Sequence, residues 1–304
     1  MNTKKLLVIL AFAAIYFIWG TTYLANIFGL QDMKPFVLST LRYTAAAAIM
    51  LVWCFIKKLT FPTGRQLKGL VISGLLMLGG GAGFVVIGEQ YINSGHTAVV
   101  IATEPLLFLL MDKKGWKTNF SNKWMLTGLL LGFAGIFLFS RFTADPHAAA
   151  GSTMELIKGT LLVLMSTIFW VSGTLYARKH QAGESSGVAD AAVQHLAAAI
   201  ACFIIAFSLG EWRTFTPSEI SLSAWGALAF LVVMGSLVAF IAFSWLMRIK
   251  TPAVVSTHTY VNPVVAVIIG CLVAKEQVSP LQIMALVMVL TGVVLTSMKK
   301  PAIA

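Results

Sequence analysis

The chain has 304 residues, of which 58% are hydrophobic and 11% charged, and its formal net charge is +11. Ordinary soluble domains carry about 25% charged residues. A soluble protein of this length would lack the charge to cover its surface, so we exclude an ordinary soluble domain and expect lipid around most of the chain. Because the Lys and Arg residues stand between apolar stretches, where they face anionic headgroups, we expect no nucleic-acid partner.

Apolar stretches long enough to cross a bilayer recur along the whole chain. A bilayer core requires about 20 apolar residues per helix, and a helix satisfies its own backbone hydrogen bonds in lipid. The sequence therefore predicts an all-α integral membrane protein with ten transmembrane helices. We place them at 6–27, 36–56, 68–88, 95–112, 124–140, 158–177, 188–209, 222–247, 252–274 and 280–298.

The basic residues are divided unequally between the two sides of these predicted helices. With the N-terminus on one side, 16 Lys and Arg residues fall on that side and five on the other. Short basic loops remain in the cytoplasm, so we predict that both termini are cytoplasmic.

The predicted helices divide into two halves of five. The most polar segment near the middle, 142–157, is expected to be a periplasmic linker between a first repeat at 1–141 and a second repeat at 158–304. The segment SGHTAVVIATEP, which ends at Pro105, resembles PAVVSTHTYVNP, which ends at Pro263. Since each half has an odd number of helices, the second half enters from the opposite side. The halves form inverted repeats, an architecture typical of transporters.

Short motifs stand out at corresponding places in the predicted helices. They are Trp19-Gly20, Leu41-Arg42-Tyr43, Pro105, Pro263 and Lys275-Glu276. Together and in this order they resemble the drug/metabolite transporter superfamily, specifically the EamA-type permeases, over essentially the whole chain. The resemblance implies a central cavity lined mainly by the third, fourth, eighth and ninth helices. The first and sixth helices also contribute.

Two polar residues precede prolines near the predicted midplane. Glu104 lies about ten residues into the fourth helix, where a carboxylate is costly unless it faces a cavity, a partner or a proton. Asn262 lies at the corresponding depth of the ninth helix, in place of the acidic residue that the family often has there. We expect Pro105 and Pro263 to break their helices. Glu104 is a candidate substrate-binding residue, and a structural glutamate beside a tolerated kink is the alternative.

Five further residues are candidates for the cavity wall. His258 and Asn262 share one face at i, i+4, and Tyr260 lies between them; interhelical hydrogen bonding is the alternative role. Trp19 and Trp170 lie away from the interfacial belts, so they are candidate cavity walls or packing residues. Arg42 would attract anions if it faced the cavity, although stabilisation of the fold is the favoured role.

The sequence thus predicts a multi-pass protein of the bacterial inner (plasma) membrane. We expect a secondary active or facilitative transporter that exports small metabolites or amphipathic compounds by alternating access around a midplane cavity. A channel-like facilitator and an intramembrane enzyme are the alternatives. No P-loop lysine and no HExxH motif occurs, so we expect neither an enzyme nor a cofactor or metal. Small-molecule substrate and membrane lipid are the expected partners, and proton coupling and a homodimer are left open.

Overall fold

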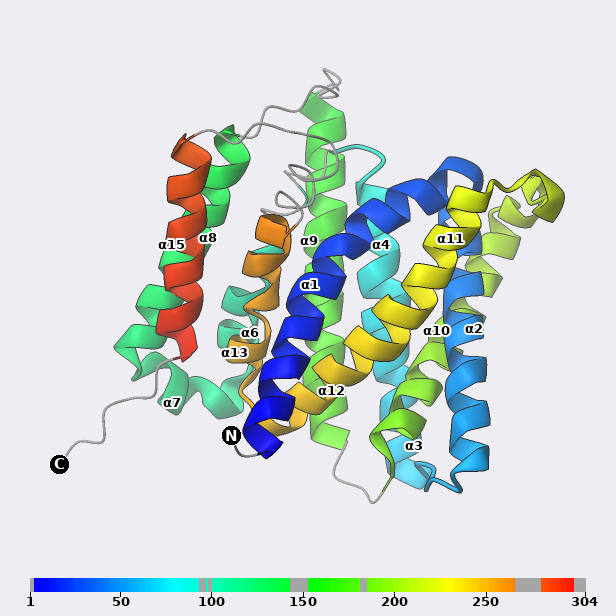
Figure 1. Cartoon of the computed structure of the whole chain (residues 1–304), viewed down its shortest axis with the longest axis horizontal. Helices are drawn as coiled ribbons and strands as arrows, with labels where there is room; N and C mark the ends of the chain where they lie inside the picture. Colours follow the sequence, from blue (N-terminus) through cyan, green and yellow to red (C-terminus); the bar gives the residue numbers. More distant parts are fainter. Residues whose placement is uncertain are drawn as a thin grey trace.

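The computed structural model describes residues 3–92, 97, 100–142, 153–180, 185–265 and 280–297. Every regular element in these residues is a helix, which confirms the all-α prediction. Figure 1 shows the long helices running between two ends of a bundle, called here the lower end, where α1 begins, and the upper end, where α1 terminates. The predicted number of ten membrane-spanning helices and the placement of the termini stay predictions.

The first half contains these elements: α1 (Thr3–Asp32), α2 (Pro35–Ile56), α3 (Gly64–Gly74), η1 (Leu75–Ala82), α4 (Gly83–Gly88), α6 (Glu104–Met111), η2 (Lys113–Gly115), α7 (Trp116–Phe120) and α8 (Lys123–Phe142). The second half contains α9 (Thr153–His180), α10 (Gly187–Ser208), η3 (Glu211–Thr214), η4 (Pro217–Glu219), α11 (Leu222–Phe230), η5 (Leu231–Ala239), α12 (Phe240–Ile249), α13 (Pro252–Val255) and α15 (Pro280–Ser297). Residues 258–265 are also helical.

Within the described residues, six helical stretches are long and apolar enough to cross a membrane. They are Thr3–Asp32, Pro35–Ile56, Gly64–Gly88, Met154–His180, Gly187–Ser208 and Leu222–Ile249. The predicted fourth and ninth helices and the predicted linker fall partly outside the described residues. Large apolar side chains cover the outer surface: on α10, Ile200, Phe203, Ile204 and Phe207 are each about half exposed or more. Lipid is the solvent that such a surface requires.

Two long stretches contain a π-helical segment in their middle. η1 joins α3 to α4 without interruption, and η5 joins α11 to α12 in the same way. A π-helix widens the turn and shifts the side chains that follow it, and such segments are frequent at functional sites. The sequence of η1 contains three consecutive glycines, Gly79–Gly81, whereas η5 contains one glycine, Gly235.

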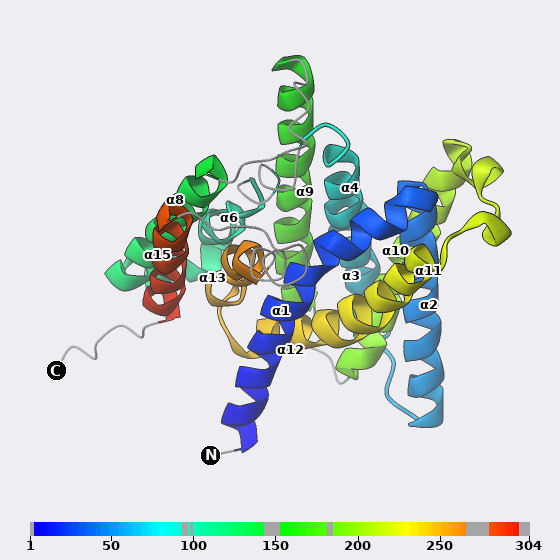
Figure 2. The same ribbon diagram turned by 45° about the horizontal axis from the view of Figure 1, so that its top comes forward.

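Small residues allow the helices to approach closely. On α8 and α15, a Cβ added at Gly292 would lie 2.6 Å from the backbone oxygen of Gly128. On α3 and α10, a Cβ added at Gly74 would lie 2.4 Å from the backbone oxygen of Gln194. The pair α8 and α15 stays on one side of the bundle in both ribbon views, and α2 and α10 stay on the other (Figures 1 and 2).

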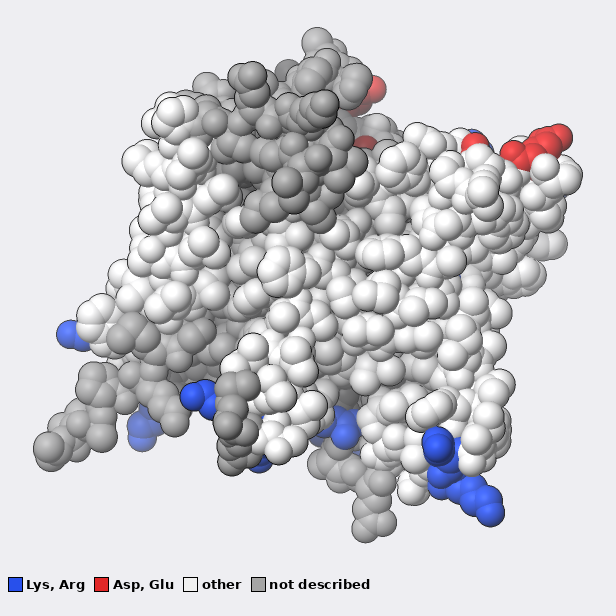
Figure 3. All heavy atoms as spheres, in the orientation of Figure 1, with Lys and Arg blue, Asp and Glu red and all other residues white. Residues whose placement is uncertain are grey.

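The charged side chains separate toward the two ends. Lys and Arg gather at the lower end, where α1 begins and α15 terminates, and Asp and Glu gather at the upper end (Figure 3). Between the two ends, the described surface on this face is almost free of Lys, Arg, Asp and Glu, so an uncharged band crosses the side that the figure shows. Such a band is the arrangement expected of a protein embedded in a bilayer.

Candidate functional site

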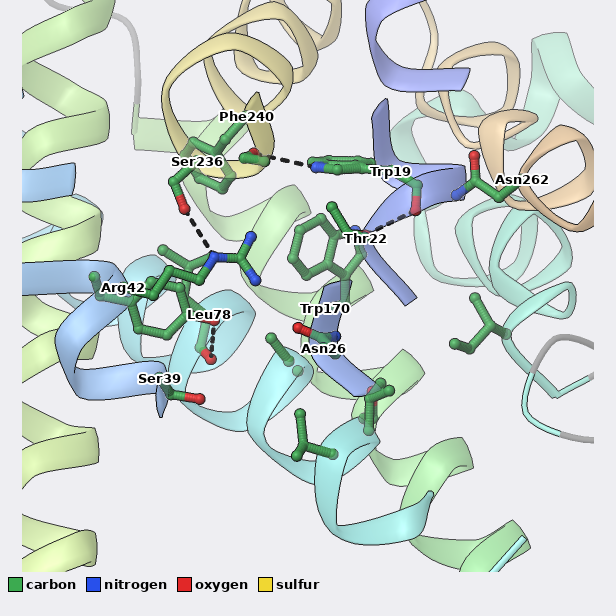
Figure 4. A pocket seen from close by; sticks show the side chains of 18 of the residues that line it. Trp19, Thr22, Asn26, Ser39, Arg42, Leu78, Trp170, Ser236, Phe240 and Asn262 are labelled. Atoms are coloured by element: carbon green, nitrogen blue, oxygen red, sulfur yellow. Dashed lines mark hydrogen bonds between the residues drawn. The ribbon is translucent and has the colours of Figure 1, made fainter. Parts of the chain in front are cut away.

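A cavity of about 150 Å³ lies among helices from both halves of the chain. Residues of α1, α2, η1, α4, α9 and η5 form most of its wall (Figure 4). In α1 the lining residues run from Trp19 to Asn26, and in α2 from Leu38 to Tyr43. These are the parts of α1 and α2 nearer to the upper end. The cavity therefore extends from the middle of the bundle toward the upper end.

Four aromatic rings pack against one another at the lower side of the cavity, and we call them the aromatic floor: Trp19, Trp170, Phe243 and His258. The ring centroids of Trp19 lie 5.6 Å from Trp170, 5.1 Å from Phe243 and 4.8 Å from His258. Trp170 and Phe243 are 5.6 Å apart. Tilted and edge-on aromatic pairs at these separations are favourable beyond the area that they bury. Trp19, Trp170 and His258 line the cavity at this side, and Phe243 packs against all three.

Hydrogen bonds fix α1 across this floor. Trp19 Nε1 donates to the backbone oxygen of Gly235 in η5 at 3.3 Å. One turn nearer the lower end, Tyr16 Oη and Thr257 Oγ1 are 2.9 Å apart. Because both bonds join the first half of the chain to the second, α1 cannot move relative to the second half without breaking them.

Arg42 lies in α2 and reaches across to η5. Its Nε donates to Ser236 Oγ at 3.0 Å, and its guanidinium carbon lies 5.4 Å from the ring centroid of Tyr43. The described residues form two ion pairs, Arg178 with Asp112 and Arg248 with Asp190, and neither includes Arg42. Figure 4 shows the terminal nitrogens of Arg42 directed into the cavity, on the side of Trp170.

Glu104 is buried at the cavity wall. Its side chain is 4% exposed, and within the described residues its Oε1 has no hydrogen-bond partner. The helical hydrogen bonding is interrupted at 102–103, and α6 begins at Glu104 with Pro105 in its first turn. The break thus precedes Pro105, where the missing N–H costs no hydrogen bond.

Asn262 and His258 both line the cavity, as their i, i+4 spacing predicts. With its amide nitrogen turned toward α1, Asn262 donates to the backbone oxygens of Tyr16 at 3.1 Å and His258 at 2.8 Å. His258 Nδ1 lies 3.1 Å from the backbone oxygen of Val255. The chain turns at 256–257 and is helical from 258 to 265, so the break precedes Pro263 by six residues. Asn262 makes an interhelical hydrogen bond as well as forming part of the wall.

Tyr260 is the one candidate that the structure does not bring to this cavity. Its hydroxyl donates to the backbone oxygen of Leu129 in α8 at 3.1 Å, and its ring packs against Gly132. Tyr260 lies two residues after His258, and positions i and i+2 of a helix do not share a face. The other six candidates line the cavity, from α1, α2, α6, α9 and the segment 258–265.

Several polar lining residues were not anticipated from the sequence: Thr22, Asn26, Ser39, Thr167 and Ser236. Helical spacing could have revealed four of them. Thr22 and Asn26 follow Trp19 at i+3 and i+7, Ser39 precedes Arg42 by three residues, and Thr167 precedes Trp170 by three, so each shares a face with a predicted site residue. Ser236 carried no such signal, because it meets Arg42 only through the packing of α2 on η5.

An apolar helical bundle with a partly polar cavity at its centre is the architecture of a multi-pass membrane transporter. Residues 6–141 and 157–298 each match the EamA-like transporter family. The chain belongs to this family, which confirms the resemblance drawn from the motifs.

Two curated relatives and one solved structure show similarity over nearly the full length. The chain is 32% identical to an inner membrane transporter, YedA of Escherichia coli (strain K12), over 95% of this chain and 90% of that protein. It is 23% identical to the transporter YoaV of Bacillus subtilis (strain 168), over 94% of this chain and 95% of that protein. A crystal structure with 18% identity matches with a TM-score of 0.75 over 95% of this chain and 96% of the other, which supports the fold.

Proposed function

We propose that this transporter is a secondary active or facilitative carrier of the bacterial inner membrane that works by alternating access around the central cavity. The observation that carries the proposal is the cavity itself, which has a polar and aromatic wall inside an apolar bundle and draws its lining from both halves of the chain. A solute held there could be passed from one side to the other by movement of the halves about it.

The charge distribution supports an orientation for this cycle. The lower end carries the Lys and Arg residues and would face the cytoplasm (Figure 3). The cavity lies toward the upper end, and below it the aromatic floor and the fully buried Ile15 and Leu246 fill the space. We infer that the described conformation has its cytoplasmic side closed. The direction of net transport proposed here is export of small metabolites or amphipathic compounds.

Proton coupling at Glu104 is the proposed driving mechanism. Its burial and the absence of a partner for Oε1 among the described residues make it the carboxyl group in the cavity wall that could exchange a proton. Asn262, at the matching place in the second half, cannot titrate. We also propose that the protein forms a homodimer in the membrane, with part of its apolar outer surface as the contact between the two copies.

Counterflow in proteoliposomes tests the proposal. Vesicles loaded with a mixture of unlabelled metabolites should accelerate entry of labelled members of the same mixture, and the entry rate should saturate. Saturation with counterflow supports a carrier. Entry that rises linearly with concentration and shows no counterflow would indicate a channel, and chemical conversion without movement would indicate an enzyme.

A further inference from the structure

The guanidinium group of Arg42 has unused hydrogen-bonding capacity inside the cavity. Its Nε donates to Ser236, but within the described residues no ion pair or hydrogen bond engages its two terminal nitrogens. Figure 4 shows both nitrogens facing the open space between α1, α2 and α9. Burying an unpaired cation inside a membrane protein costs free energy unless a group of opposite charge pairs with it.

The neighbouring wall offers further donors. Trp170 Nε1 is buried and has no hydrogen-bond partner among the described residues, and the ring of Trp170 lines the same cavity. Hydroxyl and amide groups of Ser39, Thr22 and Asn26 surround this region. The ring of Trp170 gives this region an apolar face, and the two terminal guanidinium nitrogens of Arg42 form a site for a planar group with two acceptor oxygens.

The charge of the wall limits the ligand to one negative charge. Among the described residues that line the cavity, Arg42 is the only Lys or Arg, and Glu104, the only Asp or Glu, adds no charge while it holds the proton proposed above. A phosphate group carries close to two negative charges at neutral pH and would leave one uncompensated in an apolar bundle. A carboxylate carries one, and its two oxygens match the planar fork of a guanidinium.

Resting on the proposed function, we infer that the transported solutes include small organic monocarboxylates, which bind with the carboxylate on the terminal nitrogens of Arg42 and the apolar body on the aromatic floor. The cavity volume of about 150 Å³ limits them to small molecules. Arg42 is therefore a determinant of specificity that selects anions over neutral and cationic molecules of the same shape.

Three probes of similar shape and different charge test this inference. Benzoate, benzamide and benzamidinium are titrated into the purified protein by isothermal calorimetry, with phenyl phosphate as a fourth probe. We expect benzoate to bind about tenfold or more tightly than benzamide, because a bidentate charged pair is worth more than a neutral contact. Benzamidinium should not compete with benzoate. Equal binding of benzoate and benzamide, tighter binding of phenyl phosphate, or no binding of benzoate would each overturn the inference.

Variants separate the site from the overall charge. Arg42→Gln should abolish the preference for benzoate over benzamide, and Arg42→Lys should retain part of it, because lysine keeps the charge and loses the fork. Arg213→Gln removes the same charge from an exposed position at the upper end and should leave the preference unchanged. Loss of the preference in Arg213→Gln would assign it to the net charge of the protein and overturn the role of Arg42.

Failure of this inference can be distinguished from failure of the proposed function. Counterflow of the metabolite mixture is measured on the same preparations of wild-type protein. Saturable counterflow without a preference for benzoate would support the proposal of a carrier and contradict the proposed specificity for monocarboxylates. A preference for benzoate without counterflow would leave the binding site intact and remove the carrier.

Discussion

Trp19 joins the first half of the chain to the second at the cavity. Its ring contacts Trp170, Phe243 and His258, all from the second half, and its Nε1 donates to Gly235. The sequence left two roles open for Trp19 and Trp170, a cavity wall or a packing residue. The structure places both rings on the cavity surface and also packs them against each other and against Phe243.

We expect Trp19→Ala and Trp170→Ala to lower the rate of counterflow about tenfold while folded yield falls much less. Large aromatic side chains carry much of the binding energy where they contact a ligand. Counterflow per unit of monodisperse protein is the measurement. Trp225→Ala, at an exposed place in α11, is the control and should leave both quantities near wild type. Equal loss of yield and rate in the two cavity variants would assign them to packing.

Glu104→Gln should abolish transport driven by a pH gradient and leave exchange at equal pH nearly intact. The amide keeps the shape and hydrogen bonding of the carboxyl group and cannot release a proton. Both activities are measured in liposomes with and without an imposed gradient. If the rate of wild-type transport does not depend on the pH gradient, the coupling proposal is wrong. If Glu104→Gln lowers both activities equally, Glu104 has a structural role at the start of α6.

At the scale of elements, the lower end is held by a network that joins α3, α10 and α12. Arg248 Nη2 and Asp190 Oδ2 are 2.5 Å apart, and Asp190 Oδ1 accepts from Ser185 Oγ at 2.6 Å. Gln66 Nε2 in turn donates to Ser185 Oγ at 2.5 Å. The network ties segments of both halves together below the aromatic floor, so it stabilises the conformation in which this end is closed.

Asp190→Asn should loosen the lower end. Replacing one member of a buried ion pair destabilises the contact, and weakening by about 1 kcal/mol would raise the population of the open state roughly fivefold. The measurement uses a single cysteine in place of the buried Ile15, in a protein from which the native cysteines have been removed. If Asp190→Asn opens the lower end more often, this cysteine should react faster with an impermeant maleimide added from that end. Lys179→Gln, which removes an exposed charge at the same end, is the control. An unchanged rate in Asp190→Asn would show that the network does not hold this end closed.

The contact between α8 and α15 depends on glycine. Gly292→Val should lower stability by about 1–3 kcal/mol, because the added atoms meet the backbone of Gly128 and Gly132 and force the helices apart. Thermal unfolding in detergent measures the change. Gly226 in α11 has no atom within 4 Å of an added Cβ, so Gly226→Ala should be neutral or stabilising. Equal stability of Gly292→Val and wild type would contradict the close packing.

At the scale of the whole molecule, the separation of charge sets the orientation in the membrane. Single cysteines at Lys117 and Lys179 should react with an impermeant reagent only from the cytoplasm, and one at Glu219 only from outside, because short basic segments stay in the cytoplasm. Spheroplasts and inverted vesicles provide the two sides. Labelling of all three positions from the same side would overturn the inverted arrangement of the halves.

The sequence by itself determined that the chain is an integral membrane protein and gave the approximate bounds of six of its helices. Those results follow from length, apolar content and motif order, which are properties of the chain that do not depend on how helices pack. It also predicted the position of each candidate residue along its helix, because each residue of a helix advances it by about 1.5 Å.

Only the tertiary structure decided which residues share the cavity. Depth along a helix does not give the direction of a side chain around it, and an apolar helix in lipid has no polar face to reveal that direction. Tyr260 lies two residues from His258 on the same helical segment and contacts α8, whereas Ser236 meets Arg42 across 194 positions of sequence. Ser236 lies in the π-helical segment η5, at the place where η5 packs against α2. The contact between Arg42 and Ser236 therefore depends on tertiary packing and cannot be predicted from the neighbouring sequence.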